Sequence, residues 1–249
     1  MKTKLWAAAL VLLTIWGLKR YYADARVDDL RWILSPTTRI VEAVTGAAFV
    51  FERGEGYLSR DRLFLIEKSC AGINFMIAAF GMSAFVLCRR AGSMAACAAA
   101  IGESVLVSYA AAVVVNAVRI AVALWLVAHP IAATGLTAAE VHRLEGIVVY
   151  FGGLVLLCAL LQQQGGVVSA FRLTGMTFRW VAVPLGWYYA ITLALPLANG
   201  AAHVGARFAE HAVIVIAVPL TLIALGYSAC GLARFVCSCR PAARGNQPL

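Results

Sequence analysis

This sequence carries little charge for its length. Only 13% of its 249 residues are Asp, Glu, Lys or Arg, whereas 62% are hydrophobic. Soluble domains have about 25% charged residues and about 45–50% apolar ones. Because no soluble core could bury this much apolar surface, the composition excludes an ordinary soluble protein. It predicts an all-α polytopic membrane protein.

The sequence also lacks the signatures of several enzyme classes. It has no HExxH zinc motif, no P-loop and no GxSxG nucleophile elbow. Its seven cysteines are irregularly spaced, and Cys237 and Cys239 are too close together for a zinc knuckle. We therefore expect no disulfide framework, no metal site and no cofactor.

Six apolar runs are candidate membrane spans, each near the roughly 20 residues that cross about 30 Å of hydrocarbon. They are residues 1–18, 73–88, 94–115, 142–161, 181–198 and 212–235. Residues 116–129 are too few to cross again, so they either turn back or continue along the outer surface. The first run is either an uncleaved span, which the basic Lys19–Arg20 pair favours, or a signal peptide.

Four basic clusters in the short connections predict the orientation, since Lys and Arg prefer the cytoplasmic side. They are Lys2 with Lys4, Arg89 with Arg90, Arg172 with Arg179, and Arg234 with Arg240 and Arg244. Six spans place all four clusters and both termini inside the cell. An alternative layout makes 109–128 a full span, which puts His142 on the face opposite Cys70.

We divide the chain into five parts. They are a first span (1–18), an extracytoplasmic segment (19–68), a catalytic membrane core (69–161), a C-terminal helical pair (162–236) and a disordered cytoplasmic tail (237–249). Within the second part, "SPTTRIVEAVTG" at 35–46 predicts an amphipathic helix in the membrane interface. Two β-rich runs around a glycine-containing turn predict a short hairpin that leads into Cys70.

Three polar residues from distant parts of the chain converge at the outer face in this topology. Cys70 opens the second span beside Lys68, and both the cation and a helix N-terminus stabilise a thiolate. Arg119 lies within an apolar run, where a charge costs about 2.5–3.5 kcal/mol even on lenient scales and indicates function by default. His142 opens the fourth span.

These residue types suit acyl transfer. A thiolate attacks a carbonyl, an imidazole carries the proton, and a guanidinium stabilises the oxyanion or holds a substrate carboxylate or carbonyl. Each also has a plainer interpretation: Cys70 as structural, Arg119 as reaching the headgroups, and His142 as an interfacial histidine.

Three further residues support the constellation by helical spacing. Asn74 comes four residues after Cys70, and Asn116 comes three before Arg119, so we expect each to share a face with its neighbour. Gly146, four residues after His142, would let another helix or a peptide approach closely. Interhelical hydrogen bonding is the alternative role of the two asparagines.

Three motifs occur in a fixed order: "SCAGINF" (69–75), "NAVRI" (116–120) and "HRLEG" (142–146). With the external helix and hairpin before the cysteine, the chain resembles the exosortase/archaeosortase family over about residues 30–160. The "CAGINF" form is similar to the exosortase K branch. Two features depart from the family: Ala71 stands where many members have serine, and only one span precedes Cys70.

The resemblance implies a membrane cysteine transpeptidase or protease in the bacterial inner membrane, with its active site on the extracytoplasmic face. Its partners would be exported proteins with a C-terminal sorting motif, one transmembrane helix and a basic tail, of the PEP-CTERM type that accompanies exopolysaccharide systems. Cys70 would be the nucleophile, His142 the acid/base and Arg119 the stabilising residue. The acceptor that resolves the intermediate stays open.

Two other functions fit parts of the sequence. A small transporter or channel would place Arg119 and Glu103 in a polar pathway. A non-catalytic membrane assembly subunit would use Cys70 only structurally. The clustering of polar residues at one membrane face favours the enzyme.

Overall fold

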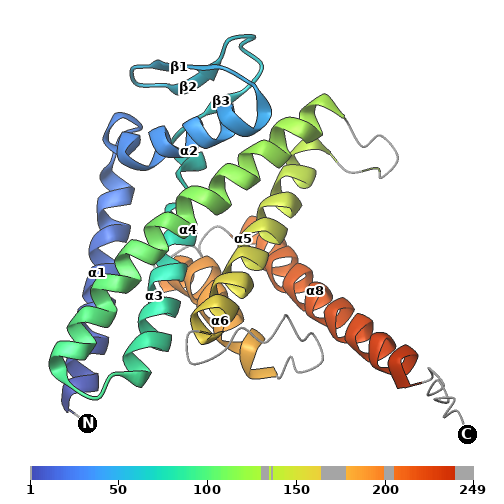
Figure 1. Cartoon of the computed structure of the whole chain (residues 1–249). Helices are drawn as coiled ribbons and strands as arrows, with labels where there is room; N and C mark the ends of the chain where they lie inside the picture. The colour runs from blue at the N-terminus through green and yellow to red at the C-terminus, as the bar shows by residue number, and fades with distance from the viewer. Residues whose placement is uncertain (1, 130–134, 136, 164–177, 199–204, 239–249) are drawn as a thin grey trace, which may run out of the picture.

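A computed structural model describes residues 2–129, 135, 137–163, 178–198 and 205–238 (Figure 1). Its elements are α1 (Lys2–Asp24), η1 (Asp28–Leu30), α2 (Arg31–Thr45), β1 (Phe49–Glu52), β2 (Gly56–Ser59), β3 (Leu65–Ile66), η2 (Lys68–Ala71), α3 (Ile73–Arg90), α4 (Met94–Ala128), α5 (Ala138–Gln163), α6 (Phe178–Tyr189), the π-helical η4 (Ala190–Ala194), α7 (Leu195–Ala198) and α8 (Ala206–Ser238). The predicted class, mostly helical with a small β element, is confirmed. Most of the predicted tail, 239–249, lies outside the described residues.

The long helices have the length and surface of membrane spans. In the part of the chain that the structure describes, four segments are long and apolar enough to cross a bilayer: Lys68–Arg90, Met94–Ala128, Ala139–Gln163 and Phe208–Ser228. A shorter apolar helix covers Val181–Leu197. Only 11% of the α8 window and 33% of the α4 window are buried inside the structure, so their apolar side chains point outward. Exposing such apolar faces to water would be unfavourable, whereas contact with lipid is not. Long apolar helices with outward-facing apolar side chains are features of a helical membrane protein.

Helices α1, α3, α4 and α5 alternate in direction. Lys4 at the start of α1 donates to the Arg89 carbonyl at the end of α3 (3.3 Å), and Arg90 donates to the Leu161 carbonyl at the end of α5 (3.0 Å). These three helix ends therefore share one end of the bundle. The opposite end carries α2, the sheet, η2 and the start of α5 (Figure 1).

Helix α4 is one continuous helix of 35 residues. At 1.5 Å per residue it is about 52 Å long, well beyond the hydrocarbon thickness, so it must tilt or project past the interface. Of the two alternatives for 116–129, continuation of the helix is therefore correct. The layout that puts His142 opposite Cys70 is wrong, because α4 crosses the bundle only once.

Helix α2 lies across the end of the bundle that carries the sheet and packs on α4 (Figure 1). The predicted helix at 35–46 begins earlier, at Arg31, and ends at Gly46, whose φ of +72° caps it. Pro36 lies inside the helix and cannot donate to the carbonyl of Trp32 four residues before it. The hydroxyl of Tyr109 on α4 donates to that carbonyl instead, at 2.9 Å. The proline is thus compensated by a tertiary contact.

The predicted hairpin is part of a three-stranded antiparallel sheet with the order β1-β2-β3. Phe49 pairs with Ser59 between the first two strands, and Tyr57 pairs with Ile66 between the last two. In the turn between β2 and β3, hydrogen bonds from the Ser59 hydroxyl and the Leu63 N–H hold the pKa of Asp61 below its usual range. Strand β3 leads straight into η2, and so positions Cys70.

The contact between α4 and α5 depends on a glycine. A Cβ on Gly153 would come within 2.8 Å of Val115 Cγ1, whereas a Cβ on Gly152 would meet nothing within 4 Å. Valine is stiff at χ1 and cannot turn away easily. We expect Gly153→Ala to destabilise the protein by about 1–3 kcal/mol, as overpacking does.

Gly152→Ala is the matched control and should leave the melting temperature unchanged or slightly higher. The measurement is thermal unfolding of both variants and the wild type in detergent micelles. Equal melting temperatures for the two variants would contradict this packing.

Candidate active site

Cys70 lies in a single 3-10 turn, η2, directly before helix α3. The turn is held to the end of α1: the Tyr22 hydroxyl donates to the Lys68 carbonyl (3.2 Å), and Lys68 Nζ donates to the carbonyls of Ala23 (3.1 Å) and Ala25 (2.7 Å). From its position in the sequence, Lys68 was expected to lie beside the thiol. The structure instead turns the ammonium toward the end of α1, because those carbonyls have no partner in the helix.

Asn74 does not share a helical face with Cys70. Gly72, with a φ of +67°, separates η2 from α3, so the spacing of four residues does not span one helix. The Asn74 side chain is exposed, and its Oδ1 accepts from Lys19 Nζ at 2.7 Å. This part of the prediction is corrected by the left-handed glycine.

Asn116 on α4 is fully buried and connects the Cys70 turn to α5. Its Nδ2 donates to the Cys70 carbonyl, and its Oδ1 accepts from the Tyr150 hydroxyl at 2.8 Å. A Cβ on Gly72 would lie 3.0 Å from Asn116 Cγ, so glycine is needed both for its φ and for this approach. The Cys-Ala-Gly order thus has a physical reason.

Arg119 lies at the centre of the polar cluster formed by α4 and α5. Its Nη1 donates to the Tyr150 hydroxyl (3.3 Å), and its Nη2 lies 2.8 Å from His142 Nε2. Its Nε lies 3.8 Å from Glu145 Oε2. Gly146 permits this, because a Cβ there would come within 3.0 Å of Arg119 Nε. The predicted close approach at Gly146 is made by the arginine side chain itself.

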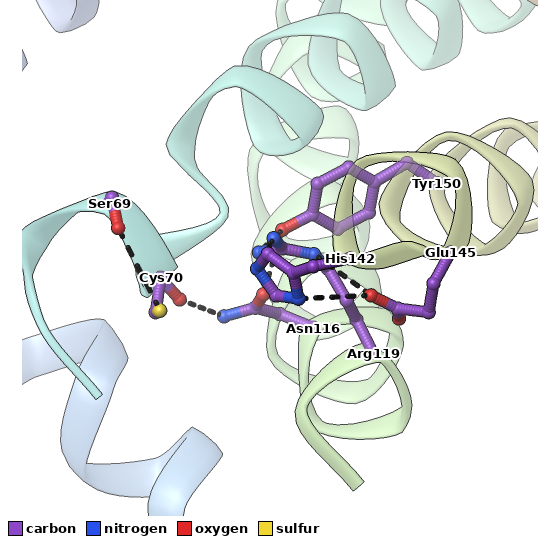
Figure 2. Close-up of polar contacts among 7 residues, drawn as sticks. All are labelled: Ser69, Cys70, Asn116, Arg119, His142, Glu145 and Tyr150. Atoms are coloured by element: carbon purple, nitrogen blue, oxygen red, sulfur yellow. Dashed lines mark hydrogen bonds and ion pairs between the residues drawn. The ribbon is translucent and has the colours of Figure 1, made fainter. Parts of the chain in front are cut away.

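The Cys70 thiol lies apart from the Arg119–His142 pair. Its one polar contact among the described residues is with Ser69 Oγ at 3.9 Å, and only 8% of the residue is exposed. Figure 2 shows the sulfur on one side of Asn116 and the guanidinium and imidazole on the other. The structure therefore brings Arg119 and His142 into direct contact and joins Cys70 to them through its backbone.

A cavity of about 320 Å³ opens beside this cluster. Its polar lining is mainly basic, with Lys19, Arg119, His142, Arg143 and His211 among the side chains, and apolar residues form the rest. Glu103, by contrast, lies exposed on α4, 16 residues before Arg119 and about 24 Å away along the helix. No three His, Cys, Asp or Glu side chains within the described ranges could hold a metal ion.

Two residues of the cluster, Glu145 and Tyr150, were not among the predicted site residues. Both were visible in principle: Glu145 follows His142 by three residues, and Tyr150 follows Gly146 by four, so all lie on adjacent positions of α5. What the spacing does not reveal is the partner helix. Only the position of Arg119 on α4 turns these residues into one network.

No family model, no curated protein and no solved structure matches this chain. The exosortase/archaeosortase resemblance therefore stays a prediction that rests on the three sequence motifs.

The glycine after the Cys70 turn gives a test of this geometry. Gly72→Ala forces a left-handed alanine, which costs roughly 1–2 kcal/mol, and also displaces Asn116. Loss of the buried Asn116 hydrogen bonds adds about 1–3 kcal/mol. Gly46→Ala is the matched control, because Gly46 has a φ of +72° but open space around its Cα.

We expect both variants to unfold at lower SDS fractions than the wild type in mixed micelles, with the larger loss for Gly72→Ala. Circular dichroism at increasing SDS fraction measures the difference. Equal losses would show that Asn116 is not held against Gly72.

Proposed function

We propose that this chain is a membrane cysteine transpeptidase or protease of the exosortase type. It removes the C-terminal sorting signal of exported proteins. The observation that carries the proposal is the hydrogen-bond path from the Cys70 carbonyl through Asn116 and Tyr150 to Arg119 and His142. A cysteine, an arginine and a histidine from three distant segments lie at one end of the bundle, and they can supply the nucleophile, the oxyanion stabiliser and the proton acceptor of an acyl transfer.

The proposed topology has six spans with both termini in the cytoplasm. It puts the end of the bundle that carries the sheet and Cys70 outside a bacterial inner membrane. The contacts of Lys4 and Arg90 support it, since they gather the basic clusters near the N-terminus and the α3–α4 turn at the other end. The positive-inside rule then places that end in the cytoplasm.

The substrate is proposed to dock its single helix between the spans, with its sorting motif extended at the outer interface. Strand β3 is an edge strand two residues before η2, so a peptide paired with it would run toward Cys70. In the proposed mechanism, binding of the scissile carbonyl draws the Arg119 guanidinium away from His142 Nε2 and brings the Cys70 thiol, which lies apart from the imidazole in the free protein, within reach of Nε2. Nε2 then receives the Cys70 proton.

The chemical step is an acyl transfer. The Cys70 sulfur bonds to the scissile carbonyl carbon, and Arg119 stabilises the oxyanion. The C–N bond then breaks, and the proton held by His142 passes to the leaving amine of the helix-bearing fragment. Water or an amine attacks the resulting thioester and returns the proton and the free thiol.

The transporter alternative has less support, since Glu103 is far from Arg119 and the polar side chains cluster at one end. The assembly-subunit alternative predicts that Cys70 is dispensable, which the following experiment decides.

Processing of a tagged exported protein bearing a C-terminal helix and basic tail tests the proposal. In the native host, we expect the wild type to remove the tail and Cys70→Ala to leave it in place. Arg119→Ala should slow removal by about 10²–10³-fold, as loss of an oxyanion donor does. Intact-mass spectrometry of the product measures removal and separates hydrolysis from transfer.

Cys88→Ala is the control, because Cys88 lies at the end of α3 that is far from Cys70. We expect this variant to process the substrate normally. Equal processing by Cys70→Ala would reject the nucleophile and favour the assembly subunit.

The orientation has its own test. In a cysteine-free variant, Glu55→Cys places a thiol in the β1–β2 turn and Gly92→Cys places one in the α3–α4 turn; both positions are exposed. A membrane-impermeant maleimide on intact spheroplasts should label position 55 and leave position 92 unlabelled until lysis. The reverse pattern would put the site in the cytoplasm.

A further inference from the structure

We propose that Glu145 is a positioning residue for His142: it holds the imidazole with its proton on Nδ1 and keeps Nε2 as the proton-accepting nitrogen. The position of the proton on the His142 ring is inferred from the contacts alone. The expected effect on the turnover rate rests on the proposed function.

The first observation is the burial of an acid without hydrogen bonds. The Glu145 side chain is 5% exposed, and neither carboxylate oxygen has a hydrogen-bond partner among the described residues. Burying an ionised carboxylate is unfavourable unless charged or polar groups face it. The groups that face it are Arg119 Nε at 3.8 Å and His142 Nδ1 at 3.6 Å.

The second observation is the direction of the contact on the other side of the ring. Arg119 Nη2 lies 2.8 Å from His142 Nε2, and a guanidinium can only donate. Nε2 must therefore accept, so the neutral ring carries its proton on Nδ1. That N–H faces the Glu145 carboxylate, which can only accept when ionised. Figure 2 shows dashed lines from the imidazole and from the Arg119 side chain meeting at one oxygen of the Glu145 carboxylate.

Helix geometry makes this arrangement specific to Glu145. His142 and Glu145 are three residues apart on α5, so their side chains are neighbours on one face. When Arg119 turns to a substrate carbonyl, the carboxylate is the group left to hold the ring. It also stabilises the imidazolium that forms when Nε2 takes a proton.

A purely structural role predicts something different. If Glu145 only neutralises the Arg119 charge, removing that charge also removes its influence on the ring. If Glu145 positions His142, it still determines the tautomer of the ring when residue 119 carries no charge and can either donate or accept a hydrogen bond.

The substrate-free test compares Arg119→Gln with Arg119→Gln/Glu145→Leu by long-range ¹⁵N–¹H NMR. The protein is labelled at its four histidines, and His142→Gln assigns the His142 signals. We expect the proton on Nδ1 in Arg119→Gln and a mixture of both tautomers in the double variant. The same Nδ1–H form in both would overturn the proposal. Glu145→Met serves in place of Glu145→Leu if the leucine variant does not stay monodisperse.

The second test uses the processing assay on an otherwise wild-type chain. Glu145→Gln should lower kcat about 10–100-fold with KM within about twofold, as loss of an orienting partner does. Glu140→Gln is the matched control: Glu140 caps the start of the same helix through Thr137, and glutamine can do the same.

The two proposals fail separately. If the wild type processes the substrate and Glu145→Gln has the same kcat, the positioning role is rejected and the peptidase stands. If the wild type processes nothing, the peptidase is rejected, and the NMR comparison still decides whether Glu145 sets the tautomer.

Discussion

The candidate site depends on the two hydrogen bonds of the Asn116 side chain. This side chain is fully buried among apolar helices, where an unpaired amide would be costly, so its two ends need partners. The Cys70 carbonyl and the Tyr150 hydroxyl provide them. The turn before α3 and the N-terminal half of α5 are thereby tied to the same point on α4. The Cys70 turn and the Arg119–His142 pair are thus both connected to this asparagine, the pair through Tyr150.

Close approach of side chains to the backbone is the second requirement, and glycine meets it at three positions around this network. Gly72 lets the Cys70 turn reach Asn116, Gly146 gives room to the Arg119 guanidinium, and Gly153 lets α5 pack on Val115. A Cβ at Gly72 or Gly146 would push away the Asn116 or Arg119 side chain that makes the polar contacts. The membrane setting makes such contacts more important, since lipid provides no hydrogen-bonding alternative.

The apolar exterior of the helices also reflects the membrane environment. Helices α4 and α8 expose apolar side chains over much of their length, whereas the window of α3 is 83% buried and forms the core of the bundle. Polar side chains gather at one end, together with α2 and the sheet. The cavity beside Arg119 and His142 lies at this end, and the charged side chains in its mostly apolar lining are basic.

Local patterns in the sequence determined the helical class, the helix ending at Gly46, the β-strands before Cys70 and the polar residues of the three motifs. Hydrophobic runs and turn residues act over a few positions, so the sequence shows them directly. Tertiary structure alone decided that α4 continues unbroken to Ala128, that Asn74 binds Lys19, and that Glu145 and Tyr150 belong with Arg119. Each of these depends on a partner far away in the chain, and spacing along one helix carries no information about the helix that faces it.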